Sequence, residues 1–233
     1  MRQTFIIIYL TYIIQLCNAQ KVEYSVQVGS GLFSFGGKSS INSTFMIVAT
    51  PGMGDYTNNP DGKESGFSYS FASQIQKLTK TNHIFGLQLG FESLSSKVLI
   101  NGISSELMYL DGSKVSGETY LINHFFNLFP YIGKRFTLNP LDIDFTAGTD
   151  FGFCANSREQ GKAEYYDSNI TTNLTRNNPN LDFRLRAELI FYYKHVGIST
   201  GYSYGLTNYT PRVMGANFQE YSRLFRFGII YKI

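Results

Sequence analysis

The chain has little cysteine, and beyond its first residues it has no long hydrophobic run. Its cysteines are Cys17 and Cys154, and only Cys154 lies beyond the N-terminal segment discussed below. The rest of the chain therefore cannot form an intramolecular disulfide, which excludes a disulfide-stapled extracellular domain. No later segment approaches the roughly 20 apolar residues that a membrane-spanning helix needs. This argues against a helical membrane protein.

Tryptophan is absent, proline is scarce and charge is low. The 233 residues include 6 Pro and 22 Gly, and 16% are charged, with a formal net charge of +3. The basic residues are scattered, so we expect no nucleic-acid partner. Aromatic residues are abundant, with 20 Phe and 17 Tyr. Together with the excess of glycine over proline, they favour strands and turns over helices.

The first residues have the three parts of a secretory signal peptide. A positive charge at the second position precedes an apolar run, Phe5–Leu16, and small residues follow at Cys17 and Ala19. This order predicts cleavage after Ala19, leaving one mature domain, 20–233. The alternative is a lipoprotein acylated at Cys17, which the bulky residue before it disfavours. An exported chain without a helical anchor is either soluble or a β-barrel.

Eight segments of the mature chain alternate apolar and polar residues with the period of two that β-strands have. The clearest lies at 181–194, and the weakest is 120–136, where apolar residues fall on both faces and Pro130 interrupts. The predicted strands are Val22–Val28, Phe67–Phe71, Phe85–Glu92, Tyr120–Phe136, Leu141–Gly148, Leu181–Lys194, Val196–Tyr204 and Leu224–Ile233.

The connections between these segments alternate between long and short. The long ones lie near 35–65, 94–117, 153–180 and 205–220, and the short ones near 79–82, 137–140 and 194–195. This rhythm is typical of outer-membrane barrels, whose short turns face the periplasm and whose long loops face outside. We therefore predict an all-β fold, an eight-stranded antiparallel up-and-down transmembrane β-barrel.

The alternative is a soluble, lipocalin-like barrel that carries a ligand, because alternation alone does not decide which face points inward. Two features favour the membrane. Aromatic residues gather near the strand ends, as they do at membrane interfaces, and charged residues of both signs share the opposite face.

Three stretches resemble the PorT-like outer-membrane β-barrel family of Bacteroidetes. They are LDFRLRAELIFYYKHVGISTGYSYGLTNY, FFNLFPYIGKRF and RFGIIYKI. In that family a proline-bearing strand precedes a basic turn, here Pro130 with Lys134 and Arg135, and a glycine-bearing strand follows, here Ala147-Gly148. The resemblance implies an outer-membrane location, contact with outer-membrane lipid and lipopolysaccharide, and insertion by the barrel-assembly machinery.

Charged residues on the predicted inward face suggest a paired network. An eight-stranded barrel is just wide enough to be filled by side chains, and buried charges need partners. The alternative is an ion-conducting path or a substrate site. The candidate lumen residues are Asp142, Asp144, Asp150, Arg184, Arg186, Glu188 and Arg226.

Few residues point to catalysis. His83, His124 and His195 show no metal-ligand spacing, and no nucleophile-elbow motif is present. We therefore expect no cofactor, metal or catalytic residue, with a lipid-modifying enzyme built around His124 as the alternative. Cys154 is predicted to be a bystander thiol in the third long loop.

The long loops are the most plausible functional surface, because binding residues gather on loops held by a rigid scaffold. The first contains Pro51–Tyr56 and Asn58–Gly62, the second has a hairpin tip at Leu110–Ser113, and the third runs from Tyr165 to Pro179. We predict a non-enzymatic structural, surface-binding or assembly component that can bind a surface protein or glycan.

Overall fold

The structure, a computed structural model, describes residues 21–49, 54–105, 109–111, 115–166, 168–177, 179–210 and 217–233. These residues form twelve strands and no helix, which confirms the all-β prediction. The strands are β1 (Lys21–Gly36), β2 (Ser43–Ile47), β3 (Tyr56–Thr57), β4 (Glu64–Leu78), β5 (His83–Ser104), β6 (Tyr109–Asp111), β7 (Val115–Leu138), β8 (Leu141–Tyr165), β9 (Ser168–Thr175), β10 (Leu181–Tyr193), β11 (Val196–Gly205) and β12 (Tyr221–Lys232). The predicted signal peptide, Pro51–Met53 of the first loop and Gly112–Ser113 of the second lie outside the described residues.

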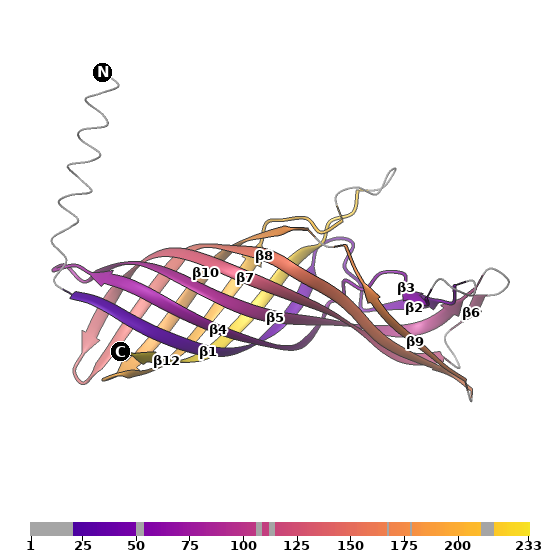
Figure 1. Cartoon of the computed structure of the whole chain (residues 1–233), viewed down its shortest axis with the longest axis horizontal. Coiled ribbons are helices and arrows are strands. Elements are labelled where there is room, and N and C mark those ends of the chain that lie inside the picture. The colour runs from indigo at the N-terminus through magenta and orange to yellow at the C-terminus, as the bar shows by residue number, and fades with distance from the viewer. Residues whose placement is uncertain are drawn as a thin grey trace, which may run out of the picture.

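Eight of these strands form a closed antiparallel ring. Its order is β1, β4, β5, β7, β8, β10, β11 and β12, and β12 pairs with β1 to close it (Figure 1). Neighbours in the ring follow each other in chain order, as the up-and-down prediction requires. Each of the eight predicted segments falls on one ring strand, and only Lys194 and Ile233 lie one residue beyond the strand end. The predicted total of eight is wrong, because the connections at one end contain the additional strands β2, β3, β6 and β9.

The two ends of the ring differ. At the turn end, β4–β5, β7–β8 and β10–β11 are joined by tight connections. Asn82 and Lys194 adopt positive φ there, of 61° and 55°, a conformation that tight turns need and that asparagine tolerates well. At the loop end, β5, β7 and β8 continue beyond the other ring strands (Figure 1).

Several predicted loop residues belong to these long strands. Most of the expected second loop, 94–117, extends β5 and β7, and Cys154 lies in β8 rather than in a loop. The family resemblance placed Lys134 and Arg135 in a turn, but they lie within β7, as the predicted strand Tyr120–Phe136 has them, and β7 continues to Leu138 before it turns. At the loop end the predictions ended too early, because there the alternation continues but changes sides.

The loop-end extension consists of β2, β3, β6 and β9, together with the part of β5 that follows Leu94, the part of β7 that precedes Phe125 and the part of β8 that follows Cys154. Strand β2 pairs in parallel with β5, β9 pairs with β8, and β3 both pairs with β2 and packs beside β9. These strands surround an apolar cluster of their own. Its buried members are Met46, Ile100, Ile103, Val115 and Ala163.

Candidate functional site: the outer belt and the charged interior

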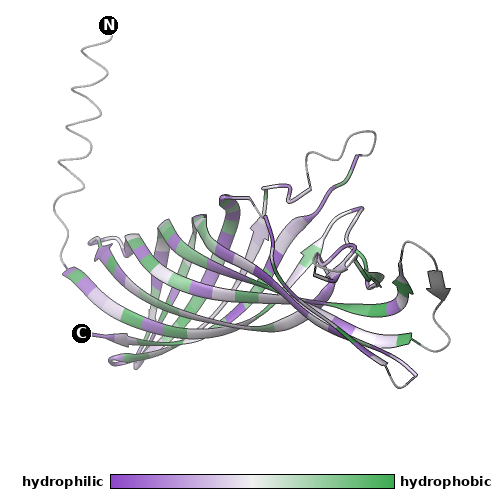
Figure 2. Cartoon of the chain, turned by 45° about the vertical axis from the view of Figure 1, so that its right-hand side comes forward, coloured by the Kyte–Doolittle hydropathy of each residue, from purple (hydrophilic) through white to green (hydrophobic). Residues whose placement is uncertain are grey.

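Large apolar side chains cover the outside of the ring. On β1 they run from Val22 to Leu32, close to the roughly 9–11 residues that a tilted membrane-spanning strand needs. Figure 2 shows the alternation of hydrophobic and hydrophilic residues along the strands. The solvent-exposed members of this outer belt include Val22, Tyr24, Val28, Leu32, Phe67, Tyr69, Phe71, Ile75, Leu89, Phe126, Ile132, Phe136, Phe145, Phe153, Leu185, Phe191, Ile198, Tyr202, Phe227, Ile229 and Tyr231.

The polarity of the two faces changes sides along β5. Within the ring, Leu87 and Leu89 point outward while Gln88 and Glu92 are buried. Beyond Glu92 the order reverses. Leu94, Val98 and Ile100 are buried, whereas Lys97 is half-buried and Asn101 is exposed, with exposed Leu99 as the apolar exception.

Strand β8 changes sides in the same way. In the ring, Phe145 and Phe153 are exposed and Asp150 is buried. In the loop-end extension the exposed positions are Arg158, Gln160, Lys162 and Glu164, while Ala163 is buried. The medium that faces the outside of the sheet therefore favours apolar groups along the ring and polar groups along the extension.

Charged and polar side chains fill the ring in three groups. The group nearest the turn end centres on Arg135, whose guanidinium donates to both oxygens of Glu23 at 2.9 and 2.8 Å. It also donates to both oxygens of Asp144 at 2.6 and 2.7 Å. The ammonium of Lys232 lies 3.4 Å from Glu23 and 3.4 Å from the centre of the Tyr192 ring. Two cations thus neutralise two carboxylates.

The middle group is built mainly from glutamine. Gln27 Nε2 donates to Glu188 at 3.0 Å, and Gln88 Nε2 donates to Gln27 at 2.6 Å. Arg186 donates to Gln88 at 2.8 Å and to Glu188 at 2.9 Å, and it lies over the ring of Phe129. Amides and one ion pair are hydrogen-bonded to one another here, as is usual for buried polar groups.

The third group lies nearer the loop end. Arg184 contacts Glu92 and Asp150, each at 3.1 Å, and Arg226 contacts the same two carboxylates, Asp150 at 2.9 Å. Arg184 is 0% exposed. Its strand register places it directly opposite Asp150, so adjacent strands supply the pair. Removing either arginine would leave buried carboxylates short of a cation.

Six of the seven predicted lumen residues lie in these groups: Asp144, Asp150, Arg184, Arg186, Glu188 and Arg226. Asp142 does not join them. It lies at the turn end, half-buried, and accepts a hydrogen bond from Thr137 at 2.8 Å. Arg135 was not among the predicted lumen residues: the predicted strand Tyr120–Phe136 contains it, but the family resemblance placed it in a basic turn. The alternating pattern carries it inward, on the same face as Tyr131 and Asn127.

Apolar side chains lie above and below these polar groups. Toward the loop end the interior is filled by one buried cluster, which consists of Phe33, Phe35, Leu94, Leu121, Phe125, Tyr209 and Leu224. Toward the turn end, Ile84, Phe129 and Tyr131 pack together, as do Ile190, Tyr192 and Ile230. The interior is thus filled by side chains, as expected of a barrel of this strand number.

Two buried carboxyl groups lie on the far side of this loop-end apolar cluster, at the base of the loop-end extension. Asp61, from the first loop, and Glu220, which precedes β12, are both buried. Asn59 donates to Glu220 at 2.8 Å, and Arg176 pairs with nearby Glu159. Burial raises the pKa of Asp61 well above its ordinary value, and Glu220 raises it further. Asp61 therefore holds its proton at higher pH than an exposed aspartate.

The candidate catalytic and metal-binding residues remain apart from one another. His124 stacks on Phe91 on the outer surface, with 5.8 Å between ring centroids, while His83 bonds to Thr81 and His195 to the carbonyl of Lys232. No group of three or more His, Cys, Asp or Glu side chains in the described ranges is arranged to hold a metal ion. The same part of the chain contains no helix that could cross a membrane.

The fold and site define a closed antiparallel β-ring with an apolar exterior and a charged, filled interior. No family model and no curated protein matches the chain. Among solved structures it is similar to Neisserial surface protein A, at 11% identity and a TM-score of 0.37, covering 92% of this chain and 100% of the other. It is also similar to the attachment invasion locus protein Ail of Yersinia pestis, at 9% identity and a TM-score of 0.36 over the same shares. It is similar as well to the translocator domain of autotransporter NalP from Neisseria meningitidis, at 9% identity and a TM-score of 0.33, covering 93% of this chain and 90% of that domain.

Proposed function

We propose that the chain is a small, non-enzymatic outer-membrane β-barrel protein, exported after cleavage near Ala19, with its turn end in the periplasm and its loop end outside. The observation that carries the proposal is the change of sides along β5 and β8. A membrane around the ring explains why the outward side chains of β5 and β8 are apolar there. Water around the extension explains why the outward side chains of the same strands are mostly polar there. In water alone, the exposed belt would cost about 25 cal/mol for each Å² of apolar surface.

The lipocalin-like alternative has less support. A carrier of that kind directs apolar side chains inward around its ligand. Here Arg184 contacts both Glu92 and Asp150 in the interior. The polar groups that would have to be displaced by a ligand are already paired, and displacing them would leave buried charges unsatisfied.

The proposal includes the finer features that the sequence suggests. Outer-membrane lipid and lipopolysaccharide would surround the belt, and the barrel-assembly machinery would insert the chain. Membership of the PorT-like family would fit the pattern of the Pro130 strand and the Tyr202–Asn208 region. A filled interior leaves the loop-end extension as the part that can meet other molecules.

On the extension, one row of outward side chains has the chemistry to bind a glycan or a surface protein. Strand register aligns Lys97, Tyr120, Gln160 and Asn173 across β5, β7, β8 and β9. An aromatic ring beside an amine and amides offers both stacking and hydrogen bonds. We propose this row as the centre of the binding surface, in place of freely solvated loops.

Two readouts test membrane insertion. The full chain should be recovered in the outer-membrane fraction, and unheated protein should migrate differently from boiled protein on a gel, as compact barrels do. It should also leave liposomes impermeable to small ions. A soluble periplasmic product without heat-dependent migration would refute the proposal and favour the carrier. Strong ion leakage from correctly folded protein would refute the filled interior.

A separate experiment tests the binding surface. Partners captured by the wild type from surface extracts should be lost when Lys97, Tyr120, Gln160 and Asn173 are together replaced by alanine. Heat-dependent migration should persist, because these substitutions leave the ring intact. A Gln160→Ala, Tyr120→Phe variant provides a milder change. Capture by both variants at wild-type levels would rule out this face.

A further inference from the structure

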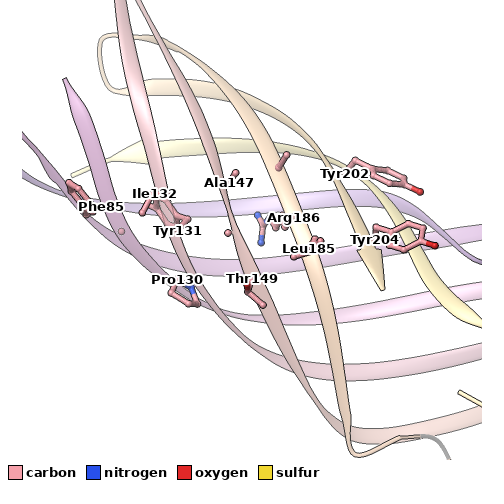
Figure 3. A pocket seen from close by; sticks show the side chains of 13 residues that line it. Phe85, Pro130, Tyr131, Ile132, Ala147, Thr149, Leu185, Arg186, Tyr202 and Tyr204 are labelled. Carbon is pink, nitrogen blue, oxygen red and sulfur yellow. The ribbon is translucent and has the colours of Figure 1, made fainter. Parts of the chain in front are cut away.

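We propose that an elongated depression in the outer belt, across β5, β7, β8, β10 and β11, holds the acyl chain of a membrane lipid. This inference rests on the proposed membrane location and goes beyond it by assigning a specific lipid site. The depression has a volume of about 870 Å³, within the roughly 300–1,000 Å³ range of small-ligand pockets. Figure 3 shows Phe85, Ile132, Ala147, Leu185, Tyr202 and Tyr204 around it.

Strand register explains why the wall is hollow here. One row across the strands reads Phe85, Ile132, Ala147, Ala187 and Tyr202. Two methyl side chains therefore lie side by side at its centre, between large side chains at both ends. Because the neighbouring strands β8 and β10 both have alanine at this register position, the two methyl groups form a low floor between the larger side chains of the row.

Rows on both sides of the floor project further outward. Toward the turn end, the next outward positions on β8 and β10 are Phe145 and Leu189, which are paired. Toward the loop end, beyond Thr149 and Leu185, they are Phe151 and Phe183, whose rings meet edge to face with centroids 5.1 Å apart. The depression is therefore open outward, with larger side chains on both sides of its floor.

The lining chemistry suits a hydrocarbon chain. The side chains are apolar apart from the hydroxyl groups of Thr149, Tyr202 and Tyr204. The polar ends of Tyr131 and Arg186, which also line the depression, are engaged inside the ring. Bulk lipid competes for this surface, so the gain must come from packing. A chain lying in the groove contacts protein on its floor and both sides, whereas a chain against a flat wall contacts it on one side.

Shape argues against a second copy of the protein as the occupant. The outside of a barrel is convex, and the belt surrounding the depression carries projecting aromatic rings. Two convex walls meeting here would leave the floor at Ala147 and Ala187 empty, which forfeits dispersion contacts. A flexible acyl chain can follow the floor.

The test fills the groove from its floor. Ala147→Phe and Ala187→Phe place rings where the chain would lie, and Ser30→Phe, at an exposed position on β1, is the matched control. Each purified protein is reconstituted in dimyristoylphosphatidylcholine vesicles that contain a phosphatidylcholine spin-labelled near the end of one acyl chain. Electron paramagnetic resonance then measures the motionally restricted lipid. Every inserted variant restricts the lipid around its belt, and wild type and Ser30→Phe should show a larger restricted component than both groove variants.

The outcomes separate this site from the membrane proposal. If wild type and both groove variants show the same restricted component, the groove proposal is wrong. If no variant inserts or shows heat-dependent migration, the membrane proposal itself fails. A groove variant that shifts the protein from dimer to monomer in detergent would assign the groove to a second copy and overturn the lipid site. Ala187→Leu, a smaller change, covers the case in which the larger ring prevents folding.

Discussion

The ring and the loop-end extension share three strands yet place polarity on opposite faces. In the ring, β5 and β8 turn apolar residues outward and charged residues inward. In the extension the same strands bury Val98 and Ile100 and expose Arg158 and Lys162. The hydrogen-bonded ladder between β5 and β7 continues across the boundary. The difference teaches that one continuous backbone ladder can have opposite distributions of apolar and polar side chains along its length. The medium outside each part of the sheet determines which face is apolar.

The two interiors are also held differently. Paired charges and amides connect opposite walls of the ring, whereas the extension is packed like the core of a small water-soluble domain. Removing one partner of a charge pair should therefore lower the stability of the ring more than removing one methylene group lowers the stability of the extension. The following predictions test this contrast, from the largest expected effect to the smallest.

Arg184→Met should destabilise the ring by about 3–5 kcal/mol, because Glu92 and Asp150 lose one of their two cations in a buried site. Urea unfolding of the protein in lipid vesicles measures the loss. The control is Arg158→Met, an exposed arginine on the extension, which should change stability by less than about 0.5 kcal/mol. Equal effects of the two substitutions would contradict the contrast between interiors.

Val28→Arg should destabilise the membrane-inserted protein by about 2–4 kcal/mol, because it places a charge on the belt near its middle. Thr171→Arg, an exposed position on β9, should have almost no effect because it faces water. Reversible unfolding in vesicles compares them. A harmless arginine at position 28 would mean that this face does not contact hydrocarbon.

Ile100→Val should cost about 0.5–1.5 kcal/mol, and only in the extension, because it removes one methylene group from the separate apolar cluster. Hydrogen exchange by mass spectrometry should show faster exchange in β2 and β9, with unchanged protection in β10–β12. Loss of protection throughout the ring would show that the two regions unfold together.

The last prediction concerns pH. Because the folded-state pKa of Asp61 is raised, the folded state binds more protons than the unfolded state between about pH 4 and that raised value. This contribution to stability is fully present below about pH 4 and is lost as pH rises through the folded pKa. Protection of the extension, corrected for intrinsic exchange, should fall accordingly. Asp61→Asn should remove this dependence, and an unchanged pH profile would contradict the assignment.

The ring could be predicted from the sequence because alternation with period two survives in each of its strands. The Arg184–Asp150 pair could also be anticipated, since both residues lie on charged faces of neighbouring strands. Outer-membrane placement stays a prediction, and so does cleavage after Ala19. What the alternation indicates is which residues share a face.

The extension and the contacts across the ring could not be predicted in this way. Beyond Glu92 and Phe153 the apolar residues move to the other face, so the strands look like irregular loops. The contact of Glu23 with Arg135 joins strands on separate parts of the ring, and no local pattern reveals it. The floor at Ala147 and Ala187 likewise depends on register, which a single residue's shift would abolish.

The seam between β1 and β12 has a consequence for how the protein is made. These strands lie at opposite ends of the ring's chain order, and Lys232 of β12 contacts Glu23 of β1 across the seam. Before β12 is in place, the growing sheet has two open edges whose unpaired N–H and C=O groups can capture other strands. Contacts so distant in sequence also form slowly. Whatever accompanies the chain during synthesis must therefore shield both edges until the final strand arrives.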